Sequence, residues 1–283
     1  MSTKVGPVLL IGGSGMLGRA WSQLLQQRGI PFRAPRHAEL DITDPATIEA
    51  HVMAETPVVV NCAAWTDVDG AESNEAAADR LNADAVGFLA RRCAAVGATL
   101  VHYSTDYIFT GHATKPYPVD GETGPLNAYG RGKLKGEEQL RAAGDDHLLI
   151  RTSWLYAPWG KNFVRTIAKL SAERPSLRVV NDQRGRPTSC EHLASATLQL
   201  LERSARGTWH VTDGGECTWY DFASAIAQRV NPACVVEPCR TDEFPRPAKR
   251  PAYSVLDLSK TEAMLGRMPD WRDNLADVLN RLE

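Results

Sequence analysis

Tyr129 and Lys133 are the pair of residues in this chain best suited to acid–base chemistry. They lie four positions apart, which places a phenol and an ammonium on one face of a helix. A tyrosine with an unperturbed pKa of about 10 is a poor acid or base at neutral pH, but a lysine ammonium one turn away favours the phenolate and lowers that pKa. Tyr129 could then donate a proton to a carbonyl oxygen while hydride reaches the carbon. Together with a dinucleotide site earlier in the chain, such a pair predicts a redox enzyme.

A Tyr-x-x-x-Lys spacing also arises by chance, and the alternative is an ordinary surface helix. Gly130 and Gly132 argue against that alternative, because a glycine inside a helix costs about 1 kcal/mol and suggests that another segment packs close to the backbone. A hydroxyl able to polarise the carbonyl follows a predicted strand in Ser104-Thr105-Asp106-Tyr107. We expect Thr105, rather than Ser104, to have this role.

A glycine-rich turn near the start of the chain could hold the source of hydride. The apolar run Val8–Ile11 leads into Gly12, Gly15 and Gly18, and a helical pattern follows. Glycine turns are common, so the alternative is an ordinary strand-to-helix turn. Between a buried strand and an amphipathic helix, however, the backbone amides and the positive helix end can bind a pyrophosphate. The turn therefore predicts a dinucleotide site.

The residues after the second predicted strand bear on the choice of dinucleotide. NAD sites usually carry an acidic residue about 20 positions after the glycine turn, where it binds the ribose 2′-hydroxyl. Here residues 33–37 hold Arg33, Arg36 and His37 and no carboxylate. Cations suit the 2′-phosphate of NADPH, so we expect NADPH with Arg36 as a contact. NADH stays the alternative cofactor, and a solvated basic loop is the other interpretation of these residues.

Two further segments follow predicted strands at the edge where nucleotides bind in open α/β sheets. Asp41 could accept a hydrogen bond from an adenine amino group, although it could equally cap the loop that leads into a helix after Asp44. Ala63 and Ala64 are small enough for a cofactor to lie close to the backbone.

Strand and helix patterns alternate along the chain and predict an α/β fold, a doubly wound parallel sheet of the Rossmann type with a smaller C-terminal substrate lobe. We expect residues 1–154 to form the dinucleotide-binding domain and residues 155–283 to form mainly the substrate-binding lobe, interleaved with the sheet. The expected strands are 8–11, 30–34, 58–61, 99–103, 147–151, 177–180 and 208–211. The expected helices are 21–28, 44–54, 75–96, 162–173, 191–203 and 219–229, and 238–251 is expected to be an irregular loop.

Composition restricts the partners. The 283 residues carry a net charge of −2, which gives no electrostatic reason to bind nucleic acid. The six cysteines show no CxxC spacing, and scattered buried thiols suit a reducing compartment. The N-terminus lacks the apolar core of a signal peptide, and no apolar run approaches the roughly 20 residues that span a bilayer. We expect a cytoplasmic protein with no membrane partner.

The sequence as a whole resembles a known family. It is similar to the extended short-chain dehydrogenase/reductases and, within them, to the dTDP-4-dehydrorhamnose reductase group over nearly its full length. The resemblance rests on Gly12–Gly18, Leu40–Ile42, Val60–Asp69, Tyr103–Phe109, Tyr129–Lys133, Arg151–Tyr156 and Gln183–Thr188.

The resemblance implies roles for individual residues. The catalytic set would be Thr105, Tyr129 and Lys133. Sugar-nucleotide contacts would fall on Thr105, Asp106 and Trp154. The residues expected at the cofactor, from the glycine turn and from the resemblance together, are Gly12, Gly15, Met16, Leu17, Gly18, Arg36, Asp41, Ile42, Ala63, Ala64, Trp65, Thr66, Tyr103, Tyr129 and Lys133.

Other features of the family are less well matched. Gly132 replaces the larger residue usual before the lysine. Some members dimerise through acidic residues and magnesium, but residues 19–23 offer no carboxylate, so we expect no metal site and leave a homodimer open. Arg186 could bind a diphosphate through two hydrogen bonds, although a solvated loop arginine is as good an interpretation.

The leading hypothesis is an NADPH-dependent reductase of a nucleoside-diphosphate 4-keto-6-deoxy sugar. A 4,6-dehydratase is disfavoured, because Tyr107 stands where the resemblance places the glutamate that performs elimination. The alternatives are a sugar-nucleotide epimerase and a non-catalytic NADP-binding subunit like the regulatory subunit of methionine adenosyltransferase. The sugar-reading lobe is expected to use Trp154, Arg186 and the loop 246–250.

Overall fold

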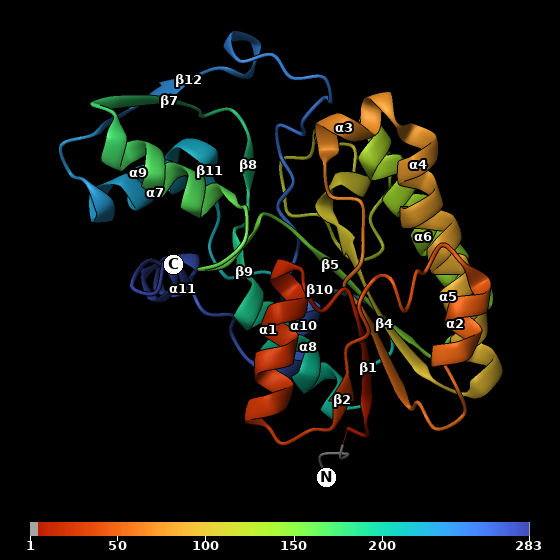
Figure 1. The fold of residues 1–283 in the computed structure, drawn as a ribbon. Helices are drawn as coiled ribbons and strands as arrows, with labels where there is room; N and C mark the ends of the chain where they lie inside the picture. The colour runs from red at the N-terminus through yellow and green to blue at the C-terminus, as the bar shows by residue number, and fades with distance from the viewer. Residues whose placement is uncertain (1–4, 283) are drawn as a thin grey trace.

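The computed structural model describes residues 5–282, and its centre is a six-stranded parallel sheet (Figure 1). The strand order is β2-β1-β3-β4-β5-β10, so the direction of winding reverses between β1 and β3. The predicted doubly wound fold is confirmed. The strands are β1 (Val8–Ile11), β2 (Phe32–Arg33), β3 (Val58–Asn61), β4 (Thr99–Thr105), β5 (His147–Thr152) and β10 (Gly207–His210).

Helices cover both faces of this sheet. In Figure 1, α1, α8 and α10 lie on one face, and α2, α5 and α6 lie on the other. Between residues 5 and 282, no helix is both long and apolar enough to cross a membrane. The helices are α1 (Met16–Gln27), α2 (Pro45–His51), α5 (Ala85–Val96), α6 (Ala128–Ala143), α8 (Cys190–Glu202) and α10 (Ser259–Leu265).

The strands divide their side chains between two cores, as the period of two in a β-strand requires. Leu10 of β1 belongs to the core beneath α1 and α8, which also contains Trp21. Leu9 belongs to the opposite core, with Leu89 of α5. The central strands β1, β3, β4 and β5 are therefore apolar on both faces, which explains the continuous hydrophobic runs of the sequence.

The helix expected over residues 75–96 is interrupted. It consists of α4 (Glu75–Asp79), a π-helical turn, η1 (Arg80–Asp84), and α5. The turn directs Asn82 toward the loop after β3, where its amide accepts from the Trp65 main-chain N–H at 2.9 Å and donates to the Trp65 carbonyl at 3.0 Å. These two hydrogen bonds stabilise a turn that apolar periodicity does not encode.

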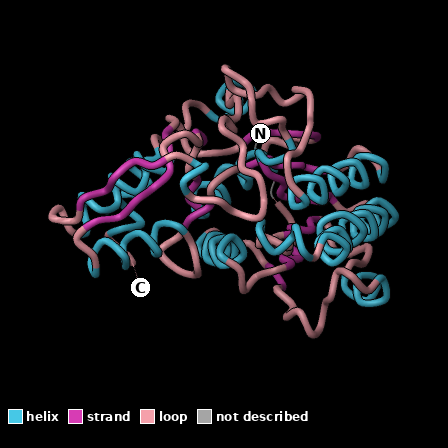
Figure 2. The backbone as a smooth tube through the Cα atoms, turned by 90° about the horizontal axis from the view of Figure 1, so that it is seen from above, coloured by secondary structure: helices cyan, strands magenta, loops and turns pink. Residues whose placement is uncertain are grey.

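A smaller lobe lies beside the sheet, and Figure 2 shows its paired strands β7 and β12 along the outer edge. The chain does not remain in this lobe after residue 155, because α8 and β10 return to the large sheet. The remaining elements are α3 (Val68–Ser73), η2 (Asp106–Ile108), β6 (Leu155–Tyr156), α7 (Phe163–Glu173), β7 (Ser176–Val180), β8 (Arg184–Gly185), β9 (Thr188–Ser189), β11 (Cys217–Thr218), α9 (Trp219–Val230), β12 (Val235–Cys239), η3 (Thr241–Glu243) and α11 (Trp271–Leu279).

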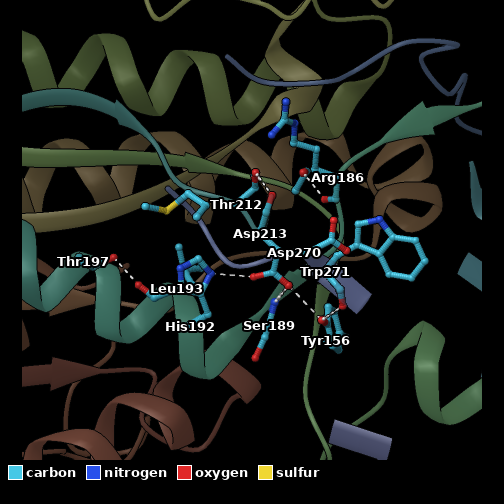
Figure 3. A network of polar contacts seen from close by, with 12 residues as sticks. Tyr156, Arg186, Ser189, His192, Leu193, Thr197, Thr212, Asp213, Asp270 and Trp271 are labelled. Atoms are coloured by element: carbon cyan, nitrogen blue, oxygen red, sulfur yellow. Dashed lines mark hydrogen bonds and ion pairs between the residues drawn. The ribbon is translucent and has the colours of Figure 1, made fainter. Parts of the chain in front are cut away.

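Asp213 joins the lobe to the sheet (Figure 3). Its carboxylate is fully buried; one oxygen accepts from the Tyr156 hydroxyl at 3.0 Å and from the Ser189 N–H at 3.1 Å. The other oxygen lies 2.7 Å from Nδ1 of His192. Because these partners come from β6, β9 and α8, a single buried carboxylate fixes three elements against one another.

We expect Tyr156→Phe to lower the free energy of unfolding by about 1–3 kcal/mol, because the buried carboxylate of Asp213 loses one donor while the packing volume is kept. Urea unfolding followed by fluorescence measures the change. Tyr220→Phe is the matched control, since among the described residues the Tyr220 hydroxyl has no hydrogen-bond partner. Equal stability of the two variants would show that the hydroxyl does not support Asp213.

Candidate active site

The glycine turn between β1 and α1 is tight at two places. Gly12 has a φ of +75°, and a Cβ there would lie 2.8 Å from the main-chain nitrogen of Ala63. A Cβ on Gly18 would run into the carbonyl of Gly12. The turn therefore lies directly against the loop that follows β3, as a nucleotide site at this edge of the sheet requires.

The N-terminus of α1 has the features of an anion site. Its cap residue, Gly15, supplies no side-chain hydrogen bond, and the first turn holds no acidic residue. The backbone amides of Met16, Leu17 and Gly18 are therefore left without side-chain acceptors, and the helix dipole adds positive potential. These residues fit the pyrophosphate of a dinucleotide.

The residues expected at the adenosine end lie on the loop after β2. Arg36 is largely exposed, and its guanidinium reaches the Glu39 carboxylate at 3.4 Å. Asp41 uses one oxygen to cap its own loop through the Thr43 N–H at 2.8 Å, a hydrogen bond that lowers the pKa of Asp41. The Ile42 side chain is buried in the core.

The loop after β3 is held from below. The Asn61 amide oxygen accepts from the Ala63 N–H at 3.0 Å, and Asn82 fixes Trp65 as described above. Ala64 is half-buried and Thr66 is exposed. The backbone of this loop is thus ordered from the protein side while its other side stays accessible.

Tyr129 lies in the first turn of α6, where Asn127 caps the helix by accepting from the Gly130 N–H at 2.8 Å. A Cβ on Gly130 would run into the carbonyl of Tyr107, so the expected close packing against this helix is present. Burial raises the pKa of Tyr129 to about 12, while the neighbouring Thr105 hydroxyl lowers it in part. Thr105 and Tyr129 are therefore together at the end of β4.

The direction and the pKa of the Lys133 side chain differ from what the sequence predicts. Its side chain is 2% exposed, and its Nζ donates to the Tyr103 carbonyl at 2.6 Å and lies 3.3 Å from Nε2 of His102. Burial lowers the pKa of Lys133 to about 8. The expectation that Lys133 lowers the pKa of Tyr129 is not met in this structure, because Nζ is directed at β4 and the loss of solvent dominates at the phenol.

Tyr103 contributes its main chain rather than its ring to this group. The Tyr103 hydroxyl lies in the core, where it accepts from the indole of Trp21 at 2.7 Å. Only its carbonyl faces Lys133. The sequence could not distinguish these two orientations, since alternate residues of a buried strand point to opposite faces.

Asp106 supplies a second polar group beside Thr105. The carboxyl is 2% exposed; its Oδ1 accepts from the Thr105 hydroxyl at 2.9 Å, and its Oδ2 has no hydrogen-bond partner among the described residues. Burial raises the pKa of Asp106 to about 7, against the opposing effect of neighbouring polar groups that include the hydroxyls of Ser254 and Thr105. An unpartnered buried oxygen next to the reacting group is suited to a ligand hydroxyl.

Trp154 is held in a strained conformation. Its φ is +49°, its ring stacks on Trp219 at 3.5 Å between centroids, and a Cβ on Gly185 would touch the indole. The sequence singled out Trp154 but missed Trp219, which is distant along the chain. Backbone strain at a residue so firmly packed is typical of functional positions.

The main chain of Arg186 lies close to Trp154. The Arg186 carbonyl accepts a hydrogen bond from the hydroxyl of Ser153, the residue before Trp154, at 2.6 Å. In Figure 3 its guanidinium points away from Asp213. The side chain lines a cavity of about 310 Å³ that also contains Asp257, Glu262 and Asp270. These carboxylates lie near the charge of Arg186, and its contact with a diphosphate stays a prediction.

Over the part of the chain that the structure describes, no group of three or more His, Cys, Asp or Glu side chains could hold a metal ion. The site instead combines an uncapped helix N-terminus, a buried lysine and a hydroxyl–phenol pair at one sheet edge. This fold and site define an extended short-chain dehydrogenase/reductase.

The chain belongs to the family described as RmlD substrate binding domain, whose profile matches residues 6–283. It is 40% identical over 278 residues to dTDP-4-dehydrorhamnose reductase of Mycolicibacterium smegmatis, covering 96% of this chain and 84% of that protein. It is 39% identical over 280 residues to a probable dTDP-4,6-dihydroxy-2-methyloxan-3-one 4-ketoreductase of Streptomyces antibioticus, covering 95% and 93%.

Solved structures agree. The structure of dTDP-4-dehydrorhamnose reductase from Bacillus anthracis in complex with NADP superposes with a TM-score of 0.93 at 33% identity, covering 97% of this chain and 99% of that one. The resemblance that the sequence predicted is therefore confirmed.

We expect Lys133→Met to weaken NADPH binding at least tenfold while leaving the cofactor-free protein equally stable, or more stable, at pH 7. The pKa of Lys133 is lowered from 10.5 to about 8 in the folded chain, so the buried ammonium costs stability below pH 8. That cost disappears between pH 8 and pH 10.5, where the unfolded chain binds more protons.

Urea midpoints of wild type and Lys133→Met at pH 7 and pH 10, together with NADPH titrations, measure both effects. Lys135→Met is the control, because Lys135 is on the same helix but pairs with Asp79 at the surface. A Lys133→Met protein that is less stable at pH 7 and binds NADPH normally would make Lys133 a structural residue.

Proposed function

We propose that this chain is an NADPH-dependent reductase that reduces the 4-keto group of a dTDP-linked 6-deoxy sugar, as the relatives named dTDP-4-dehydrorhamnose reductase do. The observation that carries the proposal is the proximity of the Thr105 hydroxyl, at the end of β4, to the phenol of Tyr129, on the same sheet edge as the uncapped N-terminus of α1. Membership of the family supports the substrate class.

NADPH, when bound, supplies the hydride. The glycine turn Gly12–Gly18 would bind the pyrophosphate through its amides, and Arg36 would bind the 2′-phosphate after leaving Glu39. Lys133 would hydrogen-bond the nicotinamide ribose. The remaining contacts are proposed for Asp41, Ile42, Ala63, Ala64, Trp65, Thr66 and the carbonyl of Tyr103.

Tyr129 is the proposed proton donor. A pKa of about 12 keeps its phenol protonated at neutral pH, which is the form that reduction consumes. As negative charge develops on the sugar oxygen, the phenol transfers its proton there. The Thr105 hydroxyl, once its hydrogen turns from Asp106 Oδ1 to the sugar oxygen, stabilises the charge by donating a hydrogen bond. The resulting phenolate recovers its proton from solvent after product leaves.

The substrate would lie between Asp106 and Trp154. The unpartnered Oδ2 of Asp106 can accept from a sugar hydroxyl, and the Trp154 ring, fixed by Trp219, offers an apolar face to the deoxy sugar. Tyr107 opposes a dehydratase, because burial raises the pKa of its phenol and keeps it protonated, so it does not act as the base of an elimination.

We expect purified protein to oxidise NADPH with a dTDP-linked 4-keto-6-deoxy sugar, and more slowly with UDP- or GDP-linked analogues. Tyr129→Phe should lower kcat by about 10²–10⁴-fold with little change in NADPH affinity, because the phenolic proton serves only the chemical step. Absorbance at the NADPH band and fluorescence titration measure the two quantities. Turnover above about a tenth of wild type would remove Tyr129 from the role of acid.

Arg36→Ala should raise the KM for NADPH about tenfold or more and barely change that for NADH, since a charge-assisted hydrogen bond to the 2′-phosphate contributes about 1.5–3 kcal/mol. Steady-state kinetics with both cofactors test it. Arg33→Ala is the matched control, because its guanidinium is bonded to the His51 carbonyl. Equal losses for NADPH and NADH would mean that Arg36 faces only solvent.

A further inference from the structure

Three buried polar side chains form a chain from the end of β3 to α6. Asn61, His102 and Lys133 are 1%, 1% and 2% exposed. The Asn61 amide nitrogen lies 3.2 Å from Nδ1 of His102, and Nε2 of His102 lies 3.3 Å from Nζ of Lys133. The proposed reaction uses Lys133 but gives no role to Asn61 or His102.

The orientation of the Asn61 amide determines which nitrogen of His102 carries hydrogen. The amide oxygen already accepts from the Ala63 N–H, so the NH₂ group faces His102 and can only donate. Nδ1 must then present a lone pair. Burial holds the pKa of His102 far below its ordinary value, so the ring is neutral and its hydrogen is on Nε2.

This tautomer directs an N–H at Lys133. A lysine ammonium has three hydrogens and no lone pair, so it cannot accept from Nε2–H, whereas the neutral amine can. A charged Lys133 is compatible with His102 only if the hydrogen moves to Nδ1, and then Nδ1–H and the Asn61 NH₂ oppose each other. The hydrogen-bond geometry therefore couples the charge of Lys133 to the Asn61–His102 contact.

We propose that Asn61 and His102 are positioning residues that favour the neutral amine of Lys133 in the cofactor-free protein, so that dinucleotide binding is coupled to uptake of one proton by Lys133. The proton comes from solvent, the new ammonium donates to the ribose hydroxyls, and His102 keeps its net charge. The assignment of Lys133 to the ribose rests on the proposed function.

Other charged groups near Lys133 also affect the pKa values of Lys133 and His102. Glu137, one turn further along α6, raises the pKa of Lys133, but its carboxylate is shared by Arg151 at 2.8 Å and Arg141 at 2.6 Å. His147 on β5 lowers the pKa of His102, as Lys133 does. Because Glu137 is largely neutralised, the tautomer of His102 is the part of this environment that a single substitution can reverse.

The test is the pH dependence of NADPH affinity in the full chain, measured by fluorescence titration between about pH 6 and about pH 10, a range that spans the titration of a lysine of lowered pKa. Wild-type affinity should fall as pH rises, because binding needs the ammonium. In His102→Gln the amide oxygen can accept from Nζ, so the fall should begin about one pH unit higher. Asn61→Ala removes the amide that fixes the tautomer of His102, so it should also move the fall in NADPH affinity to higher pH.

His147→Gln is the matched control, since His147 is a buried histidine whose Nδ1 contacts the Gly144 carbonyl and not Lys133. Its pH profile should equal that of wild type. Calorimetry in buffers of different ionisation enthalpy should show proton uptake on NADPH binding by wild type near pH 8, and less uptake by His102→Gln.

The outcomes separate this proposal from the proposed function. No NADPH binding by wild type would overturn the proposed function, whereas binding without proton uptake and with unshifted variant profiles would overturn this proposal alone. If both variants fail to fold, ¹⁵N NMR of the histidines in the cofactor-free wild type decides. Hydrogen on Nε2 of His102 is the expected result, and hydrogen on Nδ1 would contradict the proposal.

Discussion

The burial of the Lys133 side chain between α6 and β4 is the interaction on which the rest of the site depends. An ammonium or amine at 2% exposure must find acceptors, and here the Tyr103 carbonyl provides the closest one. Such burial requires α6 to approach its neighbours closely. Glycine makes this possible, since a Cβ at Gly132 would lie 2.7 Å from the Asp79 carboxylate and one at Gly136 would run into the Asn82 carbonyl.

The same close approach links α6 to the loop after β3. The π turn that contacts α6 also carries Asn82, whose side chain fixes Trp65. The loop after β3, the helix that bears Tyr129 and the buried lysine are thus held by one set of contacts. Because parallel strands end at a common edge, these groups meet the glycine turn of β1 without any long insertion.

The fold could be predicted from the sequence to a large extent. The ends of β1 and β3 match the apolar runs, because strands buried on both faces are continuous hydrophobic segments. The second strand was expected over 30–34 but pairs only at Phe32–Arg33, since it lies at the edge of the sheet. The helix expected over 75–96 contains the π turn, which depends on a partner in another segment.

The site was predicted less completely, and for the same reason. Local spacing identified Thr105, Tyr129 and Lys133. The directions of the Lys133 and Tyr103 side chains, the roles of Asn82 and His102, and the stacking of Trp219 on Trp154 all arise from contacts between residues far apart in the sequence. Spacing along one segment carries no information about such contacts.

We propose that this sheet edge delivers hydride to a sugar ketone while Tyr129 supplies the proton. Isotope transfer tests it most directly. The protein is incubated with NADPH deuterated at the transferred position of the nicotinamide and with a dTDP-linked 4-keto-6-deoxy sugar, and the product is read by NMR. We expect one deuterium on carbon 4 of the sugar; a product without deuterium at carbon 4, or no conversion at all, would show that hydride is not delivered there.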